Sequence, residues 1–184
     1  MPSARLEPTP PPYSESVTAM LARLMPPGTP PLALFRTLAA SDRVLSRMLA
    51  GGLLDRGPIS LGEREIVILR TCARLDSEYE WGVHVAMFSE KAGLTAAEVA
   101  ATRCDTSTAL ACFSARDGLL VRLVDELVDT AHVSDVLWSE LAARWSSAAL
   151  VELVALVGFY HSVSFATNAF RIPNEAFGAR FPRQ

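Results

Sequence analysis

Residues 60–75 read SLGEREIVILRTCARL, and this stretch decides the fold. It opens with Ser60 and, three residues later, Glu63, which is the pattern of a capping box at the N-terminus of a helix. From Ile66 onward the segment is apolar on almost every side, and a helix of that kind is buried on most sides. We therefore expect a central helix over residues 61–75, packed among other helices.

The next stretch, residues 77–88, reads SEYEWGVHVAMF and predicts a second helix that continues to about residue 92 and stops at Gly93. Thr95 caps a further helix, and apolar residues recur at helical spacing over residues 34–49, 117–130, 134–145 and 147–170. The sequence has no sustained alternation of apolar and polar residues, so strands are not expected. The predicted fold class is all-α, a compact multi-helix domain of roughly eight helices.

The first 31 residues contain nine of the twelve prolines. Proline lacks a backbone N–H and disfavours helix interiors, so residues 1–13 are predicted to form an extended arm, followed by one short helix over residues 13–25. Such an arm either lies across a neighbouring subunit or frays at the terminus. Residues 32–184 are predicted to form a single all-helical domain.

Composition excludes several classes of partner. Half of the 184 residues are apolar and the net charge is −3, which is typical of a soluble domain and argues against nucleic acid as a partner. The most apolar stretch, residues 148–160, is shorter than the roughly 18–20 residues of a membrane span, and no apolar signal segment is visible, so no membrane partner is expected. The three cysteines form no Cys-x-x-Cys pair and are predicted to be reduced thiols in the cytoplasm.

Glu80 and His84 lie four residues apart in the second helix, and residues at this spacing share a face. A carboxylate beside an imidazole suits proton transfer, and Glu65 in the preceding helix can supply a second carboxylate. Two other interpretations stay open: Ser77 and Glu80 also fit a capping box, and His84 also fits a hydrogen-bonded histidine of the core. The sequence has no His-Glu-x-x-His pattern, so neither a metal nor another cofactor is predicted.

Three motifs resemble those of the carboxymuconolactone decarboxylase family, which includes the alkylhydroperoxidase D-like proteins. They are Leu61-x-x-Arg64-Glu65-Ile66, Tyr79-Glu80-Trp81-x-x-His84 and Ala92-Gly93-Leu94-Thr95-x-x-Glu98. The resemblance implies a compact all-helical fold and self-association as a dimer, trimer or hexamer. Because the family carries different chemistries on one scaffold, the resemblance specifies the fold better than the reaction.

The departures from the family pattern bear on function. Peroxidase-type members carry a Cys-x-x-Cys pair with a histidine four residues after it and a glutamate twelve residues before it. In this chain Ser77 and Glu80 stand at the two cysteine positions, whereas His84 and Glu65 are retained. A thiol peroxidase needs an attacking thiolate and a resolving thiol, so that activity is disfavoured. Decarboxylase-type members look like Glu-Leu-x-x-His here, and the segment from Glu80 to His84 is similar.

We therefore predict an acid–base lyase, a decarboxylase that acts on a small organic acid or lactone as its small-molecule substrate. Glu65 and His84 would transfer protons, and Glu80 would orient His84 or act as an acid. The predicted substrate-binding residues are Trp81 as a pocket wall, Tyr79, His161, and three arginines able to bind a carboxylate, Arg70, Arg74 and Arg171. The alternatives are a non-catalytic ligand-binding or scaffold protein on the same fold and a redox protein that uses Cys72 alone.

Overall fold

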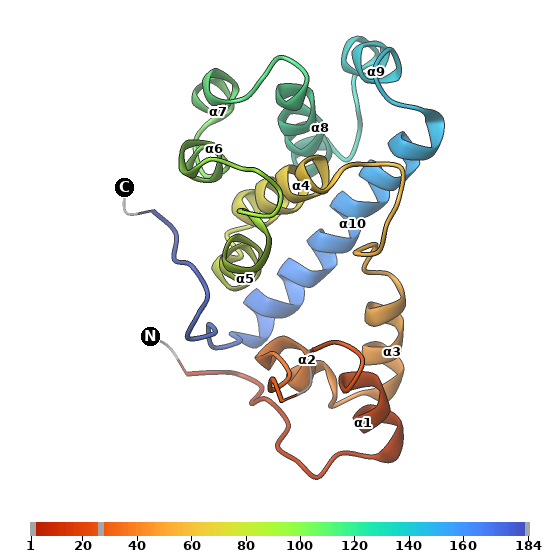
Figure 1. Cartoon of the computed structure of the whole chain (residues 1–184), viewed down its shortest axis with the longest axis vertical. Helices are drawn as coiled ribbons and strands as arrows, with labels where there is room; N and C mark the ends of the chain where they lie inside the picture. The colour runs from red at the N-terminus through yellow and green to blue at the C-terminus, as the bar shows by residue number, and fades with distance from the viewer. Residues whose placement is uncertain (1–2, 26–27, 183–184) are drawn as a thin grey trace.

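The structure, a computed structural model, describes residues 3–25 and 28–182. These residues form ten helices and no strand, in agreement with the predicted all-α class (Figure 1). The helices are α1 (Glu15–Leu21), α2 (Ala33–Leu38), α3 (Asp42–Ala50), α4 (Leu61–Arg74), α5 (Glu78–Phe88), α6 (Ala96–Ala101), α7 (Thr106–Cys112), α8 (Asp117–Thr130), α9 (Asp135–Ala142) and α10 (Ser147–Phe170).

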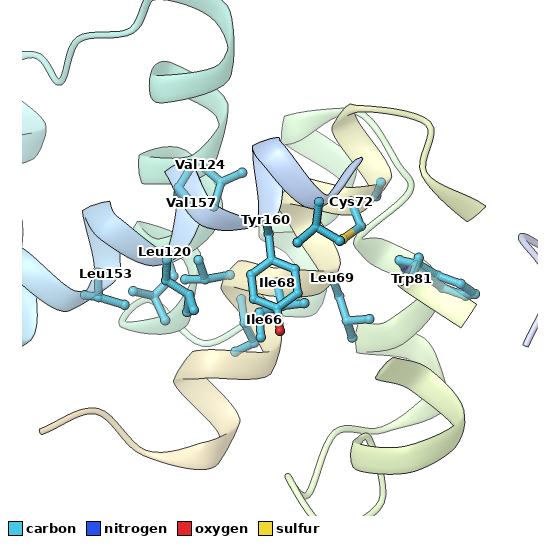
Figure 2. Packing of buried hydrophobic residues seen from close by; sticks show 14 of the residues in the cluster. Ile66, Ile68, Leu69, Cys72, Trp81, Leu120, Val124, Leu153, Val157 and Tyr160 are labelled. Atoms are coloured by element: carbon cyan, nitrogen blue, oxygen red, sulfur yellow. The ribbon is translucent and has the colours of Figure 1, made fainter. Parts of the chain in front are cut away.

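Helix α4 is the centre of the fold, as its sequence predicted. It packs against α5, α8 and α10 and is buried from Ile66 to Ala73 (Figures 1 and 2). The capping box at its start is present, because the Ser60 side chain accepts a hydrogen bond from the Glu63 backbone and the Glu63 carboxylate accepts one from the Ser60 backbone. A helix enclosed on three sides fixes the direction of every side chain that it carries.

Helix α10 crosses the whole molecule and contacts both α4 and α5 (Figure 1). By length and composition it is apolar enough to span a membrane, and 44% of its most apolar 18-residue window is buried within the fold. Its inner face, which includes Leu153, Val157 and Tyr160, packs on α4 (Figure 2). Its outer face is also apolar but exposed, with Val151 70% and Phe165 61% accessible.

Helices α1, α2 and α3 form a separate layer at one end of α10 (Figure 1). The predicted single helical pattern over residues 34–49 is divided into α2 and α3, because the Ser41 side chain accepts a hydrogen bond from the Val44 backbone and starts a new helix. The arm before α1 lies on its own chain, since the backbone N–H of Arg5 donates to the Phe170 carbonyl. Prolines 26 and 27 lie outside the described residues.

After α10, the chain returns along α5 as an extended tail (Figure 1). The Ala179 backbone N–H donates a 3.0 Å hydrogen bond to the carbonyl of Gly82. A Cβ at position 82 would collide with the Ala179 carbonyl, so the close approach of the tail requires glycine there. The tail thereby covers the side of α5 that faces away from α10.

Candidate functional site

The site lies where α4, α5 and α10 meet, and its centre is the imidazole of His84. Glu65 on α4 points at this ring, with 2.7 Å between its Oε2 and His84 Nδ1. The Glu65 side chain is completely buried, and its other oxygen accepts a hydrogen bond from Arg64 Nε at 3.2 Å. His84 is itself only 2% exposed, so it is a hydrogen-bonded histidine of the core, and its partner at Nδ1 is a side chain rather than a backbone group.

Glu80 approaches the opposite nitrogen of the same ring, with 3.4 Å between Glu80 Oε1 and His84 Nε2. The capping-box interpretation of Glu80 is wrong: Ser77 is the N-cap of α5 but makes no side-chain cap bond, and its hydroxyl pairs with that of Thr167 at 2.8 Å. Glu80 is 7% exposed, and its Oε2 is buried with no hydrogen-bond partner among the described residues. A buried carboxylate oxygen without a donor is costly and is typical of an atom that meets a ligand.

Tyr160 on α10 completes the cluster. Its hydroxyl lies 3.0 Å from His84 Nε2, and its ring meets the imidazole edge to face (Figure 2 shows Tyr160 on the α10 side). Tyr160 was not among the residues predicted for the site, because the packing of α10 on α5 cannot be derived from spacing within one helix. The signal was a tyrosine hydroxyl in an otherwise apolar run, which must find a partner when it is buried.

The electrostatics favour a charged imidazole. Burial lowers the pKa of His84, but the hydrogen bonds to Glu65 and Glu80 outweigh it and raise the pKa from 6.5 to about 9. At neutral pH both ring nitrogens therefore carry hydrogen and donate. Burial, together with the negative charge of Glu80, raises the pKa of Tyr160 well above 10, so its hydroxyl stays protonated.

A cavity of about 380 Å³ opens beside the cluster, between α10 and the α1–α3 layer. Its walls are apolar side chains of these elements, among them Leu34, Leu38, Leu49 and Val163. The polar lining residues are Glu80 and Tyr160 at the inner end and Asp55, which is exposed. No lysine or arginine is among the described residues that line it.

The cluster is thus layered from the cavity inward. Glu80 and Tyr160 line the cavity, His84 lies behind both, and Glu65 lies behind His84. The three residues predicted as catalytic are brought together, but only Glu80 can touch a molecule in the cavity. Glu65 is a positioning residue for His84, which corrects the expectation that it exchanges protons with substrate.

Arg70 does not reach this cavity. Its guanidinium binds both carboxylate oxygens of Asp125 on α8 at 2.8 Å and also donates to the carbonyls of Thr102 and Cys104. Arg74 pairs with Asp125 as well. The prediction that these arginines bind a substrate carboxylate is wrong. Arg70 joins α4 to α8 and to the end of α6, and Arg74 joins α4 to α8.

The two aromatic candidates also point elsewhere. The Trp81 indole N–H donates to the Thr102 hydroxyl at 2.9 Å and its ring packs on Phe181 of the tail, so it is not a wall of the cavity (Figure 2 shows it apart from Tyr160). The Tyr79 hydroxyl accepts from the Leu34 backbone and donates to Glu175. Tyr79 therefore holds the cavity residue Leu34 in place without lining the cavity itself.

The remaining two candidates lie on α10 away from the cluster. His161 is half-buried and packs against the exposed ring of Phe165. Arg171 is exposed and terminates α10 with a left-handed backbone, φ 52°. Neither residue lines the cavity. Within residues 3–25 and 28–182, no group of three or more His, Cys, Asp or Glu is arranged to hold a metal ion.

Comparisons with known proteins agree with this architecture. Residues 40–119 match the family model described as the carboxymuconolactone decarboxylase family. A comparison with curated protein sequences gave no match. An uncharacterized peroxidase-related protein from Silicibacter sp. TM1040 has a similar solved structure, with a TM-score of 0.79, 13% identity, and coverage of 97% of this chain and 96% of that one.

A second similar structure is the alkylhydroperoxidase AhpD core of an uncharacterized peroxidase-related protein from Ralstonia eutropha JMP134. Its TM-score is 0.77 at 14% identity, and the alignment covers 95% of each chain. At this identity the two structures establish the fold that the chain shares with them, while the chemistry must be argued from the residues of the site itself.

Proposed function

We propose that this chain, whose residues 40–119 match the carboxymuconolactone decarboxylase family model and which has no Cys-x-x-Cys pair, is an acid–base enzyme. Glu80 exchanges a proton with a small molecule held in the apolar cavity. The observation that carries this proposal is the Glu80 carboxylate oxygen, which is buried beside the cavity with no partner among the described residues. A base in this position meets a substrate hydrogen without having to break an existing bond.

The residues behind Glu80 make the proton transfer reversible. When Glu80 takes a proton from substrate, the imidazolium of His84 stabilises the negative charge that is left on the substrate. When the proton returns to substrate, Glu80 Oε1 regains its charge beside the hydrogen on His84 Nε2. Glu65 fixes the orientation of the ring through Nδ1, and Arg64 holds Glu65.

The lyase reaction that the family resemblance implies uses the same groups. When a lactone acid loses carbon dioxide, the bond to the carboxylate breaks, its electron pair stays on the carbon, and a proton then adds to that carbon. His84 and Glu80 can deliver this proton. The substrate carboxylate, however, would enter a cavity whose charged lining residues are Glu80 and Asp55, so the site supports proton transfer more strongly than it supports binding of an acid.

A non-catalytic ligand-binding protein on the same fold is the second candidate, since the cavity alone would suffice for it. The paired imidazole favours the enzyme, because binding of an apolar ligand does not require two carboxylates on one buried histidine. A peroxidase is disfavoured because Ser77 and Glu80 cannot provide thiol chemistry and because burial raises the pKa of the Cys72 thiol.

Proton transfer can be tested by incubating the protein in deuterated buffer with uncharged lactones and with lactone acids, and by following deuterium incorporation and carbon dioxide release. We expect Glu80→Gln to lower the rate of the reactive substrate by about 10²-fold or more. Glu90→Gln, which removes an exposed carboxylate from the segment that follows α5, is the matched control and should leave the rate unchanged. An unchanged rate in Glu80→Gln would contradict the proposal, and binding without turnover in wild type would favour the second candidate.

We also propose that the protein self-associates in the cytoplasm. The outer face of α10 and the neighbouring α9 expose the large apolar side chains Val151, Val154 and Trp138, which line a groove of about 610 Å³ between α8, α9 and α10. Exposed apolar patches of this kind are typical of protein–protein contacts. Light scattering on the purified chain measures the subunit number.

A further inference from the structure

A second unmatched polar group lies beside Glu80 at the inner end of the cavity. The Tyr160 hydroxyl has His84 Nε2 as its single hydrogen-bond partner among the described residues. Since the imidazolium donates through Nε2, the hydroxyl accepts that bond, and its own hydrogen is left for another acceptor. Two side chains that line the cavity therefore each keep one unused polar group, the donor Tyr160 Oη–H and the acceptor Glu80 Oε2.

The Tyr160 hydroxyl and the Glu80 carboxylate both lie close to the same atom, His84 Nε2. Tyr160 Oη lies 3.0 Å and Glu80 Oε1 lies 3.4 Å from the same nitrogen of His84. A ligand atom that accepts from Tyr160 and a ligand hydrogen that meets the Glu80 carboxylate can therefore belong to the same small functional group. A carbonyl oxygen and the C–H of the adjacent carbon have this relationship.

The charges of the site disfavour an ionic ligand. An anion at this end of the cavity would face the Glu80 carboxylate and would find no lysine or arginine in the described lining. A cation would compete with the imidazolium of His84 for Glu80. The rest of the wall is apolar, and burial of an uncharged apolar ligand there is favourable in proportion to the area removed from water.

Building on the proposed function, we infer that the substrate class is an uncharged, largely apolar carbonyl compound, such as a ketone or lactone, that is converted through its enolate. Glu80 takes the hydrogen from the carbon next to the carbonyl. The electron pair of that C–H bond forms the new C=C bond, and the C=O π pair moves to oxygen, where the Tyr160 hydroxyl donates to it. Return of the proton from Glu80 to the same or to a conjugated carbon completes exchange or isomerisation without another reactant.

Binding can be tested with four bicyclic probes of the same size, measured by equilibrium dialysis against the full chain. The probes are 2-tetralone, tetralin, which lacks the carbonyl, 2-aminotetralin, which is a cation at neutral pH, and tetralin-2-carboxylate, an anion. We expect 2-tetralone to bind most tightly, by about tenfold over tetralin, which is the effect of one hydrogen bond of about 1.4 kcal/mol. Tighter binding of either ion, or no preference for the ketone over tetralin, would overturn the inference.

A variant separates the hydroxyl from the shape of the cavity. Tyr160→Phe should abolish the preference for 2-tetralone over tetralin and slow deuterium exchange at the carbon beside its carbonyl, whereas Tyr13→Phe, the matched control outside the cavity, should change neither. A preference that survives in Tyr160→Phe would contradict the role of the hydroxyl. The wild-type comparison of the four probes stands without any variant, so a misfolded Tyr160→Phe protein would not leave the inference untested.

The two proposals fail in different ways. Exchange that depends on Glu80, with an anion as the tightest ligand, would overturn the carbonyl class and leave the acid–base function in place. A ketone preference that depends on Tyr160, with exchange unaffected by Glu80→Gln, would refute the acid–base function.

Discussion

The imidazole shared by two carboxylates allows a direct test of the site, because Glu65→Gln removes one negative charge and keeps the shape of the side chain. In the wild-type protein, burial lowers the pKa of His84, and the hydrogen bonds to Glu65 and Glu80 raise it overall from 6.5 to about 9. At about 1.36 kcal/mol per pKa unit, this difference corresponds to about 3 kcal/mol in favour of the charged ring.

Glu65 is the stronger of the two partners. Its Oε2 lies 2.7 Å from Nδ1, whereas Glu80 Oε1 lies 3.4 Å from Nε2. In Glu65→Gln, Glu80 is the one carboxylate left to stabilise the charged ring. The burial that disfavours the imidazolium is unchanged. We expect the pKa of His84 in Glu65→Gln to fall by at least about one unit, corresponding to about 1.4 kcal/mol.

Nuclear magnetic resonance can follow this titration directly, since the chain has three histidines and their ring signals can be assigned by substitution. The signals of His132 and His161 serve as internal references, and Glu90→Gln controls for the loss of a carboxylate elsewhere. A His84 pKa that is the same in Glu65→Gln as in wild type would refute the ion-pair argument. A wild-type His84 that titrates near 6.5 would refute the imidazolium on which the proposed mechanism depends.

Four further predictions concern His84 and the packing of the helices around it. The folded-state pKa of His84 lies above its unfolded value, so its contribution to stability is complete below about pH 6.5 and is lost as the pH rises toward 9. The free energy of unfolding measured in urea should therefore fall by about 3 kcal/mol over this range, and it should depend less on pH in His84→Gln. Gly82→Ala should lower the melting temperature because its Cβ meets the backbone of the tail, whereas Gly158→Ala, in open space on α10, should stabilise the helix by about 1 kcal/mol in calorimetry. Arg70→Met should lower the free energy of unfolding by about 1–3 kcal/mol, because the buried Asp125 carboxylate loses one of its two arginine partners and keeps only Arg74. The affinity of the folded protein for 2-tetralone should not change. The Cys72 thiol should resist iodoacetamide and peroxide in the folded protein, as peptide mass spectrometry can measure, because it is fully buried and its pKa is raised.

Local signals predicted most of the helices. Helices α4, α8 and α10 have the bounds expected from their caps and apolar periodicity, since both are determined within a few residues of sequence. The division between α2 and α3 was missed because the apolar spacing continues across the cap that Ser41 provides. Helix α7 was missed as well, since it is short and its N-cap, Asp105, precedes a polar segment that has no apolar repeat.

The site was predicted in part for the same reason. Glu80 and His84 meet because they are one turn apart, which spacing alone specifies. The positions of Arg70 and Trp81 depend on Asp125 and Thr102, which lie far away in the sequence and were not recognised as partners. A buried polar side chain needs a hydrogen-bond partner, and the packing of the helices determines which partner it meets. Periodicity within one helix does not identify that partner.

The arrangement of Ser77, Glu80 and Cys72 disfavours thiol chemistry in this chain and is compatible with the proposed acid–base chemistry. Ser77 is buried against Thr167 and cannot reach the cavity, whereas Glu80, one turn later, lines it. Cys72 lies close to both Glu65 and Glu80, and their negative charges add to burial in raising its pKa, which is the opposite of what a reactive thiolate needs. The two carboxylates that disfavour a thiolate are the ones that raise the pKa of His84. The same two charges therefore disfavour a reactive thiolate at Cys72 and favour a charged imidazole at His84.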